Sequence, residues 1–189
     1  MTTVPYFSNG NSVLYHVDAL KLLAELPAAS VDAVITDPPY SSGGMYRGDR
    51  MQDVHTKYVK SESSTNDRVA GFTGDNRDQR SYAYWCALWL SECLRITRPG
   101  GVCALFTDWR QLPSTSDALQ AGGWVWRGIV PWHKPNGRRT PGRWANNCEY
   151  VVWGTCGPRD LDALPNAFDG FTRSTRRATA TTSRRNPCR

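Results

Sequence analysis

The chain has 189 residues, of which 40% are hydrophobic, a length and composition that predict one soluble domain with its own core. No stretch approaches the roughly 20 apolar residues of a membrane-spanning helix, and the first residues do not form a secretory signal. Six scattered cysteines without a Cys-x-x-Cys pair argue against a disulfide framework or a zinc site. We therefore expect reduced thiols in an intracellular, cytoplasmic protein.

The net charge of +6 belongs to one end of the chain. Residues 172–189 contain six arginines and no acidic residue. When those six are taken from the 23 basic residues, the remaining 17 balance the 17 acidic residues, so residues 1–171 are formally neutral. A basic surface that attracts nucleic acid is therefore predicted for this segment alone.

The apolar pattern predicts strands and helices that alternate along the chain. The expected strands are residues 13–17, 31–36, 102–106, 124–132 and 150–153, and the expected helices are residues 19–26, 81–97 and 114–121. Pro99-Gly100-Gly101 is expected to end the second helix, and residues 41–80 form a long polar excursion of the kind that is often functional. Alternation of strands and helices predicts an α/β fold with a mostly parallel, doubly wound sheet.

A tetrapeptide, Asp37-Pro38-Pro39-Tyr40, follows the strand at 31–36 directly. The carboxyl end of a strand is where open α/β sheets bind their ligands. The two prolines hold the backbone extended and remove two N–H donors, which leaves nearby carbonyl groups available as acceptors. An acid, a carbonyl and an aromatic ring in this order suit the binding of a planar ring that carries an amine. A type I turn is the alternative.

Several segments in this order resemble the amino-terminal half of the DNA amino-methyltransferases, over about residues 12–171. They are Val13–Asp18, Leu20–Leu26, Val31–Tyr40, Pro99-Gly100-Gly101 and Glu149–Val152. The resemblance implies an S-adenosylmethionine-dependent methyltransferase-like (Rossmann-like) sheet and transfer of a methyl group from S-adenosylmethionine to adenine N6 or cytosine N4. No Phe-x-Gly-x-Gly cofactor loop is present among the 36 residues before Asp37. The chain therefore resembles the permuted β group, in which that loop comes downstream, and is expected to be incomplete at its carboxyl-terminal half.

The resemblance also implies roles for single residues. The catalytic set would be Asp37, Pro38, Pro39 and Tyr40: the Asp37 carboxylate and the Pro38 carbonyl would accept hydrogen bonds from the target amine, and Tyr40 would stack on a flipped base. Asp18 and Asp37 would contact the cofactor, although Asp18 is equally suited to cap a helix. No metal is implied.

Double-stranded DNA is the implied partner. The excursion at 41–80 and the target-recognition region at about 134–147 would face it, with phosphate contacts from Lys134, Arg138, Arg139 and Arg143. A solvated turn is the alternative for these basic residues.

Two functions remain open. The first is a DNA methyltransferase, with adenine N6 expected over cytosine N4 because the motif begins with Asp where cytosine-N4 enzymes more often have Ser. The second is a non-catalytic nucleic-acid-binding remnant of such an enzyme that uses its basic tail.

The segment 172–189 is expected to be a basic disordered tail or an out-of-frame sequence after a methyltransferase domain at 1–171. Codons for residues 180–189 can be chosen so that the frame one base earlier spells His-His-Ile-Ala-Glu-Lys-Pro-Val-Pro, which is similar to the segment that relatives carry at this point. The hypothesis is a frameshift near residues 172–177. Without the downstream strands, the chain alone is expected to fold poorly and to bind S-adenosylmethionine weakly or not at all.

Overall fold

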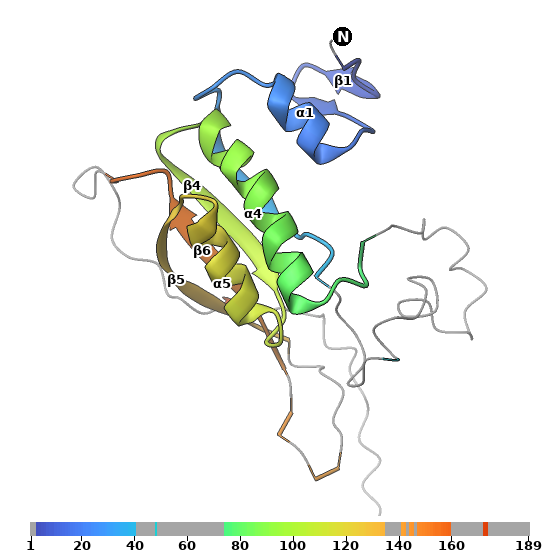
Figure 1. Ribbon diagram of the computed structural model, residues 1–189, viewed down its shortest axis with the longest axis vertical. Coiled ribbons are helices and arrows are strands. Elements are labelled where there is room, and N and C mark those ends of the chain that lie inside the picture. Colours follow the sequence, from blue (N-terminus) through green and yellow to red (C-terminus); the bar gives the residue numbers. More distant parts are fainter. Residues whose placement is uncertain are drawn as a thin grey trace, which may run out of the picture.

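A computed structural model describes residues 3–40, 48, 74–134, 141–142, 144–145, 147–159 and 172–173. Its elements in chain order are β1 (Phe7–Asn9), β2 (Ser12–Leu14), α1 (Ala19–Glu25), β3 (Val31–Thr36), α4 (Gln79–Ile96), β4 (Thr97–Thr107), α5 (Leu112–Ala121), β5 (Val125–His133), β6 (Cys148–Thr155) and β7 (Thr172–Arg173). The α4 and α5 helices lie on the same face of the main sheet, and the chain begins in a small separate hairpin (Figure 1).

The main sheet has the strand order β3-β4-β6-β5-β7. The β3 and β4 strands pair in parallel, as do β5 and β7, whereas β6 runs antiparallel to both of its neighbours, β4 and β5. The expectation of a mostly parallel sheet is thus correct for four strand directions and wrong for β6. The physical reason lies in the connection, because a chain that returns from β5 through a polar turn without a crossover helix can only pair antiparallel.

The amino-terminal strand expected at 13–17 is shorter and pairs elsewhere. The β2 strand pairs antiparallel with β1, and neither joins the main sheet. The Asn9 side chain closes the turn between them by accepting hydrogen bonds from the amides of Asn11 (3.0 Å) and Ser12 (2.8 Å). The Asn-Gly pair at this turn is a hairpin signal in the sequence that the predicted strand pattern omitted.

The Pro99-Gly100-Gly101 segment lies inside β4 instead of ending the second helix. The α4 helix has already ended at Ile96, where the Thr97 hydroxyl donates to the carbonyl of Cys93 (2.6 Å). Between the pairs Val31–Thr97 and Ala33–Val102, four residues of β4 stand opposite one residue of β3. The segment is therefore a bulge that shifts the register of the parallel pair.

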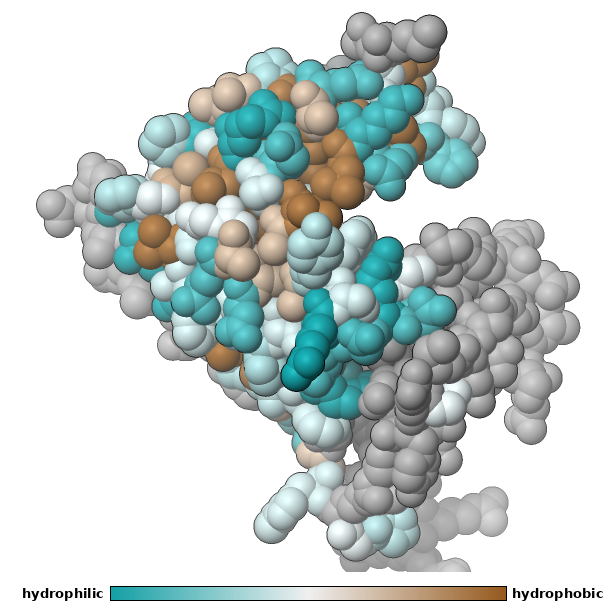
Figure 2. All heavy atoms as spheres, in the orientation of Figure 1, coloured by the Kyte–Doolittle hydropathy of each residue, from teal (hydrophilic) through white to brown (hydrophobic). Residues whose placement is uncertain are grey.

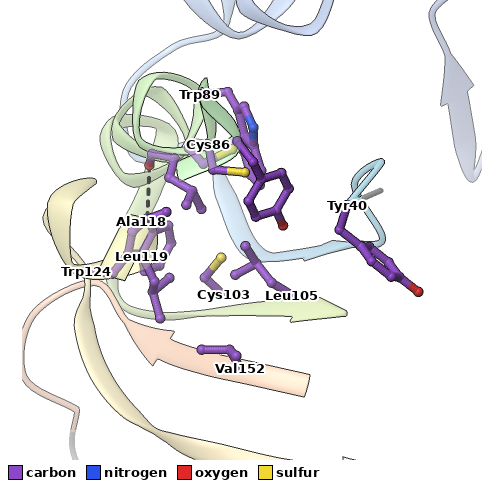
Figure 3. Close-up of a cluster of buried hydrophobic side chains, with 12 residues drawn as sticks. Tyr40, Cys86, Trp89, Cys103, Leu105, Ala118, Leu119, Trp124 and Val152 are labelled. Atoms are coloured by element: carbon purple, nitrogen blue, oxygen red, sulfur yellow. Dashed lines mark hydrogen bonds between the residues drawn. The ribbon is translucent and has the colours of Figure 1, made fainter. Parts of the chain in front are cut away.

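The core lies between the two helices and the centre of the sheet (Figure 3). Its fully buried side chains include Tyr82, Cys86, Leu90, Cys103, Leu105, Leu119 and Val152. The indole of Trp124, just before β5, donates to the carbonyl of Leu90 on α4 (2.9 Å) and so ties the sheet to the helix. The five described cysteines are unpaired, and burial raises the pKa of Cys86 to about 12 and that of Cys93 to about 11.

The amino-terminal part and the outer edge of β3 expose hydrophobic side chains. Figure 2 shows such side chains gathered at the surface of the amino-terminal part, and the most exposed in these two regions are Val4 (82%), Tyr6 (78%) and Ile35 (75%). The α1 helix has no buried residue. None of the described helices is long and apolar enough to cross a membrane.

Candidate active site

Four strand ends meet at one edge of the main sheet. Asp37 follows β3, Asp108 follows β4, Lys134 follows β5, and Glu149 lies at the start of the antiparallel β6. Because β3, β4 and β5 run in the same direction, these ends lie on the same side of the sheet, where α/β folds bind ligands. The sequence predicted site roles for Asp37 and Lys134. It gave no role to the other two.

Asp37 presents its carboxylate to solvent, whereas the next residue, Pro38, is buried. Partial burial raises the pKa of the Asp37 carboxyl, the nearby charge of Glu149 raises it further, and Lys134 lowers it. Among the described residues, none makes a hydrogen bond or ion pair with the Asp37 carboxylate or the Pro38 carbonyl. Both groups are thus open to a ligand, as the tetrapeptide predicts.

Tyr40 is 9% exposed and belongs to the cluster of buried side chains. It lies at the margin of that cluster, and its hydroxyl points away from the other labelled side chains (Figure 3). Stacking of this ring on a base stays a prediction, and it requires one face of the ring to become exposed when the base enters.

Asp108 is a buried acid (7% exposed) that was not among the predicted site residues. Its carboxylate accepts hydrogen bonds from the Arg110 guanidinium (2.7 and 2.9 Å) and from the amides of Arg110 (3.0 Å) and Gln111 (2.9 Å). An acid between a strand and a helix is a capping signal that was available in the sequence. Because its acceptors are occupied, we interpret Asp108 as the group that fixes the turn from β4 to α5.

Lys134 forms an ion pair with Glu149, and its ammonium lies 5.0 Å from the centre of the Trp132 ring. That ring packs edge-on against Phe106 of β4, with ring centres 5.3 Å apart. Trp132 and Glu149 are direct neighbours across β5 and β6, so their side chains share one face of the sheet. The other three basic residues predicted to contact DNA (Arg138, Arg139 and Arg143) lie outside the described residues.

Asp18 caps α1, since its side chain accepts a hydrogen bond from the amide of Lys21 (3.2 Å). The side chain is exposed, and within the described part of the chain no hydrogen bond or ion pair joins it to Asp37 or Tyr40. The capping role is therefore observed. Contact with the cofactor stays a prediction.

This fold and this strand-end site are those of a DNA methylase. Residues 31–180 match the DNA methylase family, and the chain therefore belongs to it.

Particular relatives agree. The chain is 25% identical over 138 residues to the type II methyltransferase M2.LlaDCHI of Lactococcus lactis subsp. cremoris, a match that covers 72% of this chain and 46% of that protein. It is 26% identical over 122 residues to the type II methyltransferase M.ScaI of Streptomyces caespitosus, which covers 65% of this chain and 31% of the relative. The chain thus spans less than half the length of these relatives.

Solved structures confirm the fold expected from the sequence. The cytosine-N4-specific PvuII DNA methyltransferase superposes with a TM-score of 0.58 at 15% identity, over 94% of this chain and 62% of that one. A DNA modification methylase from Thermus thermophilus superposes with a TM-score of 0.50 at 17% identity, over 75% of this chain and 51% of that one. The described sheet is thus the methyltransferase-like sheet, present in part.

Proposed function

We propose that the chain is the amino-terminal part of an enzyme that methylates the exocyclic amine of a base flipped out of double-stranded DNA, with adenine N6 as the target. The observation that supports this most is the pair of open acceptors at the end of β3, the Asp37 carboxylate and the Pro38 carbonyl, within the segment that matches the DNA methylase family. Such an enzyme would work inside the cell, where its DNA is.

The chemistry asks the site for position more than for a base. The lone pair of an exocyclic amine is delocalised into the ring, so the nitrogen is a weak nucleophile. Hydrogen bonds from its two protons to the Asp37 carboxylate and the Pro38 carbonyl would draw the nitrogen towards tetrahedral geometry and localise that lone pair. Tyr40 would hold the flipped base by stacking. S-adenosylmethionine, when bound, supplies a methyl group on a sulfonium that is already activated.

The described residues fit this cofactor only in part. Asp37 lies at the end of a strand whose outer edge is unpaired in the described sheet, and Asp18 is exposed, so two carboxylates could contact the cofactor. The glycine-rich cofactor loop that the resemblance implies has no counterpart before Asp37. We therefore propose that Asp18 and Asp37 hold one side of the cofactor and that binding to this chain alone is weak.

We further propose that the basic region after β5 contacts DNA phosphates, through Lys134, Arg138, Arg139 and Arg143. For Lys134, a phosphate contact would have to break the ion pair with Glu149. The preference for adenine rests on the first residue of the motif, Asp37. Cytosine N4 is the lesser alternative.

The second candidate function is a non-catalytic nucleic-acid-binding remnant. Two observations favour it: the six arginines of residues 172–189, and the coverage of less than half of the curated relatives. In this candidate, residues 1–171 form a methyltransferase domain without activity and the tail carries the binding.

Transfer of labelled methyl groups from S-adenosylmethionine to unmethylated DNA separates the two candidates. Transfer that Asp37→Ala abolishes supports the enzyme, and analysis of the labelled nucleoside distinguishes N6-methyladenine from N4-methylcytosine. Asp32→Ala is the matched control, because Asp32 lies on the same strand in an exposed ion pair with Arg98. Salt-sensitive DNA binding without transfer, lost when residues 172–189 are deleted, supports the remnant.

A further inference from the structure

Three charged groups from three different strand ends meet beside the proposed target amine: Asp37, Lys134 and Glu149. The charges of both Lys134 and Glu149 act on the Asp37 carboxyl, which places all three near one another. Yet the single ammonium of the group pairs with Glu149 and leaves Asp37 without an ion pair in the described structure. The arrangement therefore selects one of two carboxylates as the partner of Lys134.

The structure shows what makes this selection. The β5 strand, which precedes Lys134, is a neighbour of β6, which carries Glu149, whereas both β6 and β4 separate it from β3. The backbone amide of Lys134 donates to the carbonyl of Asn147, just before β6. Its ammonium also lies over the Trp132 ring, 5.0 Å from the ring centre, which adds a cation–π attraction on the same side.

Asp108 does not compete for the lysine, although it follows the strand next to β3. Its oxygens accept hydrogen bonds from the Arg110 guanidinium and from two backbone amides. Of the acids at the described strand ends, Asp37 and Glu149 are thus the two between which Lys134 can choose.

We infer that Glu149 is a positioning residue that holds the ammonium of Lys134 and thereby keeps the Asp37 carboxylate open to the target amine. A lysine carries its charge on a flexible four-carbon stem, so without Glu149 it would turn to the nearest remaining carboxylate. An ion pair between Lys134 and Asp37 would occupy the acceptor that the amine needs. The inference rests on the proposed role of Asp37 and assigns Lys134 to this site instead of to a phosphate.

The inference predicts the direction in which each variant moves the pKa of Asp37. Glu149→Gln removes one negative neighbour and frees the lysine to pair with Asp37, so both effects lower this pKa. Adding Lys134→Met to Glu149→Gln removes the new partner, and the pKa of Asp37 rises again. Glu149→Asp keeps the carboxylate and leaves the pKa close to that of the unmodified chain.

These pKa values can be measured in the full chain by following the carboxyl carbon of Asp37 by NMR during a pH titration, a readout that requires no activity. Asp32→Asn is the control, since it removes an acid from an exposed ion pair at the opposite end of β3 and leaves the pKa of Asp37 unchanged. An Asp37 pKa that stays constant in Glu149→Gln, or that Lys134→Met does not raise in that background, overturns the inference.

Methyl transfer gives the second readout. Glu149→Gln should lower kcat by roughly tenfold with KM for DNA little changed, and the double variant Glu149→Gln/Lys134→Met should recover most of that loss. Rescue by a second removal is not expected of a residue that merely supports the fold. Transfer that Glu149→Gln leaves unimpaired overturns the inference.

The two hypotheses fail in different ways. A chain that transfers no methyl group in any form contradicts the proposed function, and the carboxyl titration then still decides whether Glu149 controls Lys134. If Lys134 instead contacts a phosphate, Lys134→Met weakens DNA binding and its salt dependence equally with and without Glu149, and the kcat of the double variant is not restored. That outcome overturns the positioning role.

Discussion

Asp37 bears its charge where the protein opposes it. Burial and Glu149 raise the pKa of its carboxyl, and Lys134 offsets only part of this. A carboxyl whose pKa is higher in the folded than in the unfolded chain lowers stability once it ionises, so its contribution is favourable in acid and is lost as the pH rises through the folded pKa. The acid is therefore retained at some cost in stability, as is common at functional sites.

Asp37→Asn tests this directly. The amide keeps the shape of the side chain without its charge, so we expect methyl transfer to be lost and the melting temperature at neutral pH to stay equal or rise slightly. Thermal unfolding of both chains across the acid range should show the unmodified chain gaining on the variant as the pH falls through the pKa of Asp37. A variant that melts lower at neutral pH would show that the charge is stabilising.

The same pKa sets the acid side of the pH profile of methyl transfer. The amine can donate to Asp37 only while the carboxylate is ionised, so kcat should fall with decreasing pH at a higher pH than an unperturbed aspartate would give. Initial rates measured from acid to neutral pH give the position of this limb. A limb that does not move in Glu149→Gln would separate the activity from the Asp37 carboxylate.

At this scale the sequence predicts Asp37 and Pro38 because the tetrapeptide and its strand are contiguous. It does not predict the role of Glu149, which lies more than a hundred residues away in the chain. That role depends on the insertion of β6 between β4 and β5, and no local pattern in residues 148–155 specifies the direction of that strand.

The helices differ in how much their caps should matter. The Asp78 side chain caps α4 with hydrogen bonds from the amides of Arg80 (3.0 Å) and Ser81 (2.8 Å), and α4 buries six residues in the core. Asp78→Ala should therefore lower the free energy of unfolding by about 1 kcal/mol in urea denaturation. The control is Asp18→Ala on α1, which buries none of its residues and should show a smaller loss.

An equal or larger loss in Asp18→Ala would mean that α1 is packed more firmly than its exposure indicates. Asp18→Asn serves a different question, because asparagine caps a helix about as well as aspartate but has no charge. A change in cofactor affinity in Asp18→Asn, at constant stability, would support the proposed cofactor contact.

The bulge in β4 makes a steric prediction. A Cβ on Gly101 would lie 2.8 Å from the carbonyl oxygen of Asp32 and 2.9 Å from that of Arg98, both backbone atoms. Gly101→Ala must shift the β3–β4 pair and should cost roughly 1–3 kcal/mol in the same denaturation assay. Gly10→Ala, with no atom within 4 Å of the new Cβ, is the matched control. Equal losses in the two variants would refute the close approach.

Elements were predicted best where packing and periodicity agree. The pattern of α4 identifies a helix that the structure extends by two residues at its start and ends one residue earlier, at Ile96. Pro99-Gly100-Gly101 misled the prediction because proline and glycine also mark bulges, and here the Thr97 cap had already ended the helix. The hairpin of β1 and β2 was missed because its strands are three residues each and have no buried side chain.

The molecule as a whole is packed unevenly. The α4 and α5 helices and the centre of the sheet share a continuous buried cluster. In contrast, β3 pairs only with β4 within the described sheet, and the amino-terminal hairpin and α1 leave apolar side chains in solvent. These exposed elements flank the side on which the family resemblance implies further strands and the cofactor loop. The methylase site therefore has its target-base half in a packed framework and its cofactor half on the unevenly packed side.

This unevenness leads to an expectation about S-adenosylmethionine. A ligand stabilises a folded protein in proportion to the logarithm of its concentration over Kd, so a concentration no higher than Kd contributes at most about 0.4 kcal/mol. With only Asp18 and Asp37 proposed as contacts, we expect millimolar S-adenosylmethionine to leave the melting temperature of the full chain almost unchanged. Differential scanning fluorimetry with and without the cofactor measures this, and a sharp rise would contradict it. If such a rise is lost in Asp37→Ala but kept in Asp32→Ala, the cofactor half of the site is already formed in this chain.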